Sequence, residues 1–332
     1  MGILRRSDAL TVIEATAVRL RARPAWSDAV RLAGAITLRL LLVLLTFALV
    51  VVLVQLALVA ARTRADHAPL ADIIGQTAEG VSDYFGSLIG GSLGEASSTS
   101  ILGGRRRAMG DLVLEAYTRS IGLVVLATAT ATALGIGSGV LAAAAGRGVP
   151  RASLLTATTI ATAAPSFLIA AALVLLGSEL NARLHIRLWP TFGFGWDDHL
   201  ILPVLVLAAR PLAYVAGQTF VAVEEVLRED YIHTARSRGL LESVILLRHA
   251  LHNAAGPILA AVSTAVSIAL STLPVVEVFF SWPGLGFGLP QAIRRLDAAT
   301  AGTFLGALAV TIALFRFGLD AVAARLGRGA GG

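Results

Sequence analysis

The sequence contains no cysteine and no lysine, and it is poor in charge of either sign. The lack of cysteine excludes disulfides and thiolate metal sites. Charged residues make up only 14% of the 332 residues, against about 25% in an average soluble domain. Hydrophobic residues make up 56%. These proportions exclude an ordinary soluble domain and predict an integral membrane protein.

Several functional motifs are also missing. The chain has no G-x-x-x-x-G-K-[ST] loop, so we expect it not to hydrolyse ATP itself. It shows no H-E-x-x-H pair or other set typical of an intramembrane enzyme, and no internal repeat of the kind found in secondary transporters. The polar residues of one loop match no metal-ligand spacing: His185, Asp197, Asp198 and His199. We therefore expect no catalytic residue, no metal and no cofactor.

Six windows of about 20 apolar residues are long enough to cross a hydrocarbon core of about 30 Å. They cover about residues 40–61, 117–145, 153–177, 200–223, 257–280 and 301–324. Each window should be helical, because lipid offers no partner for backbone N–H and C=O groups. The predicted fold is an all-α, polytopic membrane protein with six transmembrane helices.

The arginines predict the orientation. A segment of residues 1–39, a turn with Arg147 and Arg151, a polar interlude at 224–256 and a tail at 326–332 all carry arginine and fall on one side. Positive loops face the cytoplasm, so both termini should be cytoplasmic. Arg105 to Arg107 lie on the other side, in an outer loop at 62–116, and cut against this rule, although a long loop weighs less in it. The Gly- and Ser-rich stretch at 82–104 of this loop should form turns and mobile chain. We expect these arginines to meet the surface of the lipid bilayer rather than nucleic acid. We also expect no cleavable signal peptide.

The polar interlude has a helical pattern from about residue 219 to 238, which Gly239 should end by adopting a positive φ. A second amphipathic helix should follow, since Leu241, Val244, Ile245 and Leu251 recur at helical spacing. Ala235 and Gly239 are four residues apart, which predicts a notch of small residues on one face. Two short helices meeting at a glycine would form a compact knob that fits a groove on another protein. The alternative is a solvated, charged loop.

Some charges and prolines lie inside the predicted spans. Arg210 and Glu277 are candidates for a pathway or an ion pair, because charges in the membrane are costly. Arg316 and Asp320 are spaced for an i,i+4 pair, for which we expect a structural role. Pro165 and Pro274 lie inside the third and fifth spans, where proline either permits bending or simply kinks the helix.

The interlude carries a long motif, "DYIHTARSRGLLESVILLRHALHNA" at residues 230–254. It resembles the cytoplasmic coupling loop of inner-membrane permeases of type I ABC importers, in the dipeptide, oligopeptide and nickel transporter group. The resemblance continues through "AAPSFLIA", "LWPTFGFG", "HLILPVLVLAARPLAYVAGQTF" and "VVEVFFSWPGLG", and it covers about residues 85–325. The chain departs from the family in lacking Gly-Asp-Pro after the first span, and in having Thr219-Phe220 where the family has Thr-Arg.

The resemblance implies a MetI-like six-span permease domain at residues 40–325, which forms half of a translocation pathway for peptides, nickel chelates or related solutes. It also implies the partners: a second homologous permease, two cytoplasmic ATP-binding subunits and an extracytoplasmic substrate-binding protein. A secondary transporter or channel that is not powered by ATP remains the alternative.

The resemblance also assigns residues to two sites. The ATPase-coupling loop would use Asp230, Tyr231, Thr234, Ala235, Arg236, Gly239, Leu240, Arg248 and His249. The pathway or outer gate would use Pro165, Ser166, Phe167, Glu277, Trp282, Pro283 and Gly284. A carboxylate near the outer end of a span needs a donor, and we expect Glu277 to find it in Arg294, Arg295 or an arginine of the partner permease.

Overall fold

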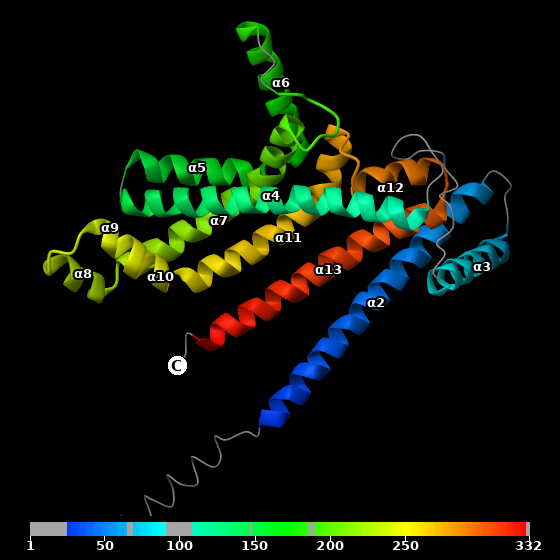
Figure 1. The fold of residues 1–332 in the computed structure, drawn as a ribbon, viewed down its shortest axis with the longest axis horizontal. Coiled ribbons are helices and arrows are strands. Elements are labelled where there is room, and N and C mark those ends of the chain that lie inside the picture. The colour runs from blue at the N-terminus through cyan, green and yellow to red at the C-terminus, as the bar shows by residue number, and fades with distance from the viewer. Residues whose placement is uncertain (1–24, 65–68, 91–107, 147, 186–188, 330–332) are drawn as a thin grey trace, which may run out of the picture. The chain divides into compact units, whose positions relative to one another are not determined.

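The computed structural model describes residues 25–64, 69–90, 108–146, 148–185 and 189–329 (Figure 1). These residues are mostly helical and include no β-strand. The chain divides into two units, residues 1–46 and 47–332, and the described part of the first unit is the N-terminal half of α2. The longer helices are α2 (Ala25–Thr63), α3 (Leu70–Ile89), α4 (Met109–Ala144), α5 (Val149–Ala163), α6 (Ser166–Leu184), α7 (Ile201–Leu227), α11 (Ala255–Phe280) and α13 (Ala298–Gly329).

Six helical segments in the described part of the chain are long and apolar enough to cross a membrane. They are Thr37–Thr63, Met109–Ala144, Ser166–Arg183, Asp198–Leu227, Ala255–Phe280 and Ala298–Phe315. The all-α fold with six membrane-spanning helices is thereby confirmed. Some predictions lie outside what is described, among them the structure of the first 24 residues, Arg147, and the side chains of Arg316 and Asp320.

The third predicted span, residues 153–177, is wrong in its bounds because Pro165 divides it into two helices. Helix α5 ends at Ala163, and Ala164 adopts an extended backbone with φ −70° and ψ 131°. Proline disfavours a helical conformation in the residue before it and has no N–H to continue the helix. Helix α6 then begins at Ser166, and the membrane-crossing segment is Ser166–Arg183. Pro165 is therefore a break and not an ordinary kink.

The turns predicted at residues 82–104 are also partly wrong, because residues 82–89 are helical. Helix α3 occupies Leu70–Ile89, and α4 begins at Met109. Tyr84 of α3 is buried, and its hydroxyl lies 3.2 Å from the Thr303 hydroxyl of α13. These tertiary contacts stabilise a helix in a stretch whose glycines and serines favour turns. Residues 91–107, with Arg105 to Arg107, lie outside the described parts.

Helices α4 and α7 form the most extensive contact in the second unit, and they lie side by side in Figure 1. Gly135 and Gly139, one turn apart on α4, face α7. A Cβ atom at Gly135 would come within 2.9 Å of the Val215 side chain, and one at Gly139 within 2.7 Å of Thr219 Cβ. Small residues spaced in this way allow two membrane helices to approach closely. Helices α6 and α11 complete this core around buried residues such as Leu207 and Leu270.

Candidate functional site

The polar interlude folds as two short arms joined by a turn, and we call residues 230–254 the knob. Its first arm is α8 (Asp230–Ser237). The expected continuous helix from residue 219 to 238 is wrong, because α7 ends at Leu227 and Glu229 adopts an extended backbone with φ −69° and ψ 145°. This break separates α8 from the membrane-crossing α7, so the knob is an element of its own.

Gly239 ends the first arm in the way that the sequence predicts, with a φ of +79°. Its N–H donates to the Arg236 carbonyl at 2.9 Å, and the Leu240 N–H donates to the Ala235 carbonyl at 3.3 Å. These two bonds form a Schellman motif, in which a left-handed residue satisfies the last carbonyls of a helix. Glycine adopts this conformation without steric cost.

The predicted notch between Ala235 and Gly239 is absent from this turn. Ala235 is only 9% exposed and packs with Ile232 and Ile245 in a small apolar cluster inside the knob. A Cβ atom added at Gly239 would have no atom within 4 Å, so no neighbour crowds this position. The notch prediction is wrong because Gly239 lies beyond the end of α8 and does not share a helical face with Ala235.

The second arm consists of α9 (Glu242–Val244), a π-helical segment η3 (Ile245–Ala250) and α10 (Leu251–Asn253). Arg236 Nε donates to Glu242 Oε1 at 2.6 Å, which ties the arms together across the turn. The Asn253 side-chain amide donates to the Tyr231 hydroxyl at 2.9 Å. Of the expected apolar face, Ile245 is buried but Leu241 is exposed, because Leu241 has an extended backbone and precedes the first helical turn of this arm.

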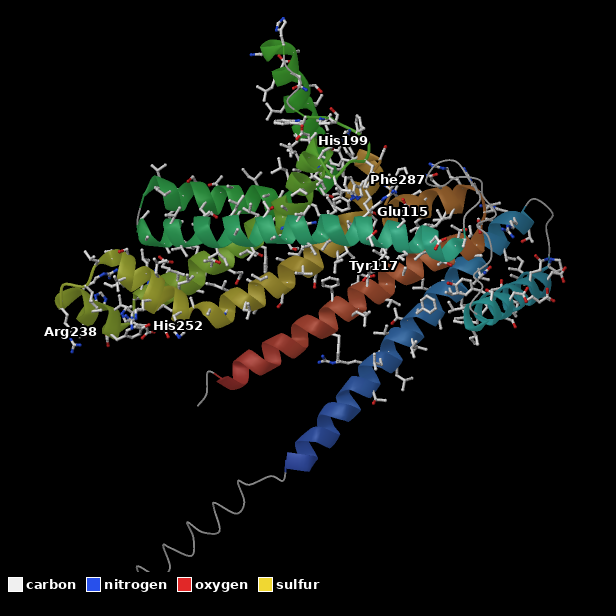
Figure 2. The ribbon with its side chains drawn as sticks, viewed as in Figure 1. Glu115, Tyr117, His199, Arg238, His252 and Phe287 are labelled. Atoms are coloured by element: carbon white, nitrogen blue, oxygen red, sulfur yellow. The ribbon has the colours of Figure 1, made fainter. Side chains whose placement is uncertain are left out.

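The knob presents apolar side chains to its surroundings. Four large ones are exposed: Tyr231 at 43%, Leu240 at 42%, Leu241 at 71% and Leu247 at 66%. Polar and basic residues of the predicted coupling set, including Asp230, Thr234, Arg236 and Arg248, are exposed beside them, and His249 is half-buried. Two further basic residues of the knob, Arg238 and His252, are exposed and are labelled in Figure 2. The knob thus combines an apolar surface with exposed charge.

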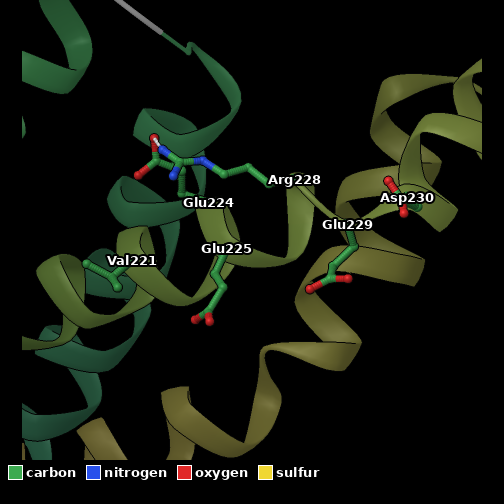
Figure 3. A pocket seen from close by; sticks show the side chains of 6 residues that line it. All are labelled: Val221, Glu224, Glu225, Arg228, Glu229 and Asp230. Atoms are coloured by element: carbon green, nitrogen blue, oxygen red, sulfur yellow. Dashed lines mark hydrogen bonds and ion pairs between the residues drawn. The ribbon is translucent and has the colours of Figure 1, made fainter.

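A pocket of about 540 Å³ lies where α7 meets the knob (Figure 3). Its lining is mostly acidic and consists of Val221, Glu224, Glu225, Arg228, Glu229 and Asp230. Glu224 accepts a hydrogen bond from Arg228 at 2.9 Å and forms an ion pair with Arg151 of α5. These pairs join α5 to the end of α7.

Near the C-terminal end of α11, Glu277 is fully buried and joins three helices. The Ser120 hydroxyl of α4 donates to Glu277 Oε1 at 2.6 Å. Glu277 Oε2 accepts from the backbone N–H groups of Gly286 at 2.7 Å and Phe287 at 3.3 Å, in the first turn of α12 (Leu285–Arg294). Phe287 is labelled in Figure 2. Ser120 Oγ in turn accepts the Leu285 N–H at 2.9 Å. Together the two side chains satisfy the first three N–H groups of α12, which otherwise lack partners.

The predicted pairing of Glu277 with Arg294 or Arg295 is therefore wrong, and a contact with an arginine of a partner permease stays a prediction. Backbone N–H groups and a hydroxyl hold the carboxylate in place of Arg294 or Arg295. Sequence reasoning missed Ser120, and no signal in the sequence could have found it, because it lies 157 residues from Glu277. Gly284 is required here, since a Cβ atom at this position would overlap the Glu277 carboxylate and Ser120.

Trp282 and Pro283 follow α11 close to this carboxylate in the chain. Trp282 is fully buried, its indole N–H donates to the Arg119 carbonyl at 3.3 Å, and its ring lies 4.8 Å from that of Phe194. The Pro283 carbonyl accepts a long hydrogen bond from Arg119. The structure thus brings Glu277, Trp282, Pro283 and Gly284 together.

Three predicted gate residues lie elsewhere. Pro165, Ser166 and Phe167 lie at the α5–α6 break, and Phe167 is 52% exposed. No hydrogen bond among the described residues links them to the Glu277 turn.

The loop before α7 contains a local pair. His199 Nδ1 lies 2.6 Å from Asp197 Oδ1, which also accepts the His199 backbone N–H at 3.0 Å. These hydrogen bonds hold the pKa of Asp197 below its usual value. No group of three or more potential metal ligands occurs among the described residues. Asp197 thus caps the short turn Asp198–Leu200, which leads into α7. His199 is labelled in Figure 2.

Comparison with known proteins finds relatives among transport permeases. A di/tripeptide transport system permease protein of Pseudomonas aeruginosa is 41% identical over 122 residues, which are 37% of this chain and 36% of the relative. A dipeptide transport system permease protein of Bacillus subtilis is 32% identical over 133 residues, 40% of this chain and 42% of the relative. A putrescine export system permease protein of Escherichia coli is 38% identical over 117 residues, 34% of this chain and 36% of the relative. The chain thus spans about two fifths or less of the length of these relatives.

A family match covers a longer part of the chain. Residues 131–331, which are 201 of the 332 residues, match the family described as binding-protein-dependent transport system inner membrane component. This region contains the knob and the Glu277 turn. It also contains the last four of the six membrane-crossing segments in full. The chain belongs to this family of inner-membrane transport components and is a multi-pass membrane protein.

Proposed function

We propose that this chain is a permease subunit of an ATP-driven importer and forms half of the translocation pathway for peptides or related small solutes. In this proposal it pairs with a second, homologous permease, receives solute from an extracytoplasmic binding protein and docks on cytoplasmic ATP-binding subunits. The family match and the peptide permeases among the relatives support the proposal.

The observation that carries the proposal is the apolar surface of the knob. Leu241 and Leu247 are each about two-thirds or more exposed, although the knob lies outside all membrane-crossing segments. Several large apolar side chains exposed on one short element favour a protein interaction surface. The Arg236–Glu242 pair and the Gly239 turn give that surface a fixed shape, as docking requires.

A double truncation tests this docking. Leu241→Ala and Leu247→Ala together should lower the recovery of ATP-binding subunits on purification of the complex, and should lower ATP-driven uptake in proteoliposomes. Apolar contacts of this size contribute about 1–2 kcal/mol each when they are buried in an interface. We therefore expect a loss of at least about tenfold in docking affinity.

Leu141→Ala is the matched control, because Leu141 is also 71% exposed but lies at the end of α4, outside the knob. This variant should assemble and transport as the wild type does. Normal docking by the double variant would exclude the knob as the ATPase contact. Uptake that proceeds without ATP would instead favour a secondary transporter or channel.

A further inference from the structure

Arg210 occupies an unusual place in the membrane-crossing segment Asp198–Leu227. It lies 12 residues from one end of this segment and 17 from the other, so at a rise of 1.5 Å per residue it is about 18 Å and about 26 Å from the two ends. A hydrocarbon core is about 30 Å thick. The guanidinium group therefore lies at a depth where an exposed charge is costly.

Within the part of the chain that the structure describes, no acidic side chain pairs with Arg210. Its Nε atom is buried and has no hydrogen-bond acceptor. The side chain as a whole is only half-buried, so part of it reaches a surface of this subunit. A charged donor with a missing acceptor in this position needs water, a partner or a ligand to satisfy it.

Arg210 begins a row of polar side chains along one face of α7. Tyr214, Gln218 and Glu225 follow at helical spacing, with the exposed apolar Val221 between the last two, and we call the four polar residues the polar stripe. Gln218 and Glu225 are exposed and Tyr214 is half-buried, whereas Ala216 on another face is buried against α4. A polar row on a membrane helix faces water or protein rather than lipid. Its cytoplasmic end opens into the pocket of Figure 3, which Glu225 lines.

We infer that Arg210 is a solute-binding residue that takes the terminal carboxylate of a peptide as it passes along the polar stripe. This inference rests on the proposed function, since it needs a solute pathway beside α7. The planar guanidinium group presents parallel N–H donors that match the two oxygens of a carboxylate. Glu225, about four turns further along the stripe, would repel a carboxylate and favour an ammonium group. The signs along the stripe thus favour binding of the carboxylate at Arg210.

Thiol accessibility tests whether Arg210 faces water. The chain has no cysteine, so Arg210→Cys introduces its only thiol. In the complex assembled with its partner subunits, we expect a charged, water-soluble methanethiosulfonate reagent to modify this thiol, detected on the separated chain. Leu205→Cys is the control, because Leu205 is 41% exposed but lies five residues away, on a different face of α7. This control should react only with a lipid-soluble reagent.

Transport tests the role of the charge. In proteoliposomes, Arg210→Gln should lower ATP-driven uptake of trialanine by about tenfold or more, since it removes charge-assisted hydrogen bonds to the carboxylate. Uptake of trialanine amide, relative to the wild type with the same peptide, should be unchanged. Arg210→Cys should show the same defect, and modification that adds an aminoethyl group should restore much of the uptake. Modification that adds a sulfonatoethyl group should not.

Each other result overturns the inference. Unchanged trialanine uptake by Arg210→Gln would show that the charge is not used. An equal loss with trialanine and its amide would show that no carboxylate is recognised. Loss of the second permease on purification of Arg210→Gln would place Arg210 in an ion pair with that subunit. The proposed function fails separately, if the wild-type complex itself shows no ATP-driven uptake of trialanine or of other peptides.

Discussion

The carboxylate of Glu277 accepts hydrogen bonds from three donors, and each would be left buried and unpaired if the acid were removed. We therefore expect Glu277→Leu to destabilise the protein strongly, since an unsatisfied buried donor costs about 1–3 kcal/mol. Glu277→Gln should have a smaller effect, because the amide oxygen still accepts the N–H groups of α12. Thermal unfolding of the purified protein in detergent would measure both effects.

Two hydroxyl deletions on α4 make the test specific. Ser120→Ala removes a donor to Glu277 and the acceptor of the Leu285 N–H, so it should also lower the unfolding temperature. Thr128→Ala should change it little, because the Thr128 hydroxyl donates only to carbonyls of its own helix. If Glu277→Leu unfolds at the wild-type temperature, the carboxylate does not hold the turn together.

At the residue scale, the sequence identified the right side chains at the outer turn but the wrong bonds. A buried acid beside Trp282-Pro283-Gly284 can be recognised from the sequence, because a charge in a membrane helix demands a partner. Its partners are backbone N–H groups and a serine distant in sequence, neither of which has a sequence signature. Arginines were expected because their charge is visible in the sequence, whereas the exposed donors of a helix N-terminus are visible only in the fold.

At the scale of elements, the Gly239 turn gives the next prediction. Gly239→Val should weaken ATPase docking and uptake, because a β-branched residue at φ +79° is strained. The strain is worth about 1–2 kcal/mol or more. Gly239→Asn should retain most of the docking, because asparagine tolerates a left-handed backbone and a Cβ atom here would meet no neighbour. Co-purification of the ATP-binding subunits measures both variants, and equal losses for both would point to contact with the docked partner instead of backbone strain.

The helices themselves could be predicted to different degrees. Five of the six spans follow from length and apolar content alone, because lipid permits only helices there. The bounds of the third span could not be predicted in this way. Proline is tolerated in many membrane helices, and only packing decides whether Pro165 kinks or breaks one. Helix α3 was missed because its Gly and Ser content favours turns, and its support comes from the contact of Tyr84 with α13. The π-helical segment of the knob likewise has no pattern of its own in the sequence.

At the scale of the whole molecule, the distribution of arginine remains the argument for orientation. The knob carries Arg236, Arg238 and Arg248, and the chain continues to Arg325 and Arg328 after the last membrane-crossing segment. Positively charged segments are retained on the cytoplasmic side of a membrane. The knob and the C-terminal tail should therefore share the cytoplasm with the N-terminal segment, and the loop before α7 should face outward.

Single cysteines test this topology, since the chain has none of its own. On intact cells, Asp198→Cys should react with an impermeant maleimide, because Asp198 is exposed and lies at the end of its membrane-crossing segment that we expect to face outward. Ser237→Cys, in the knob, and Gly332→Cys should react only after the membrane is permeabilised. Gly193 lies in the loop just before Asp198, but it is a poorer labelling site, because its φ of +112° would strain a cysteine. Reaction of all three from outside would contradict the topology, and reaction of Ser237→Cys alone would place the knob outside, where no cytoplasmic ATPase could dock on it.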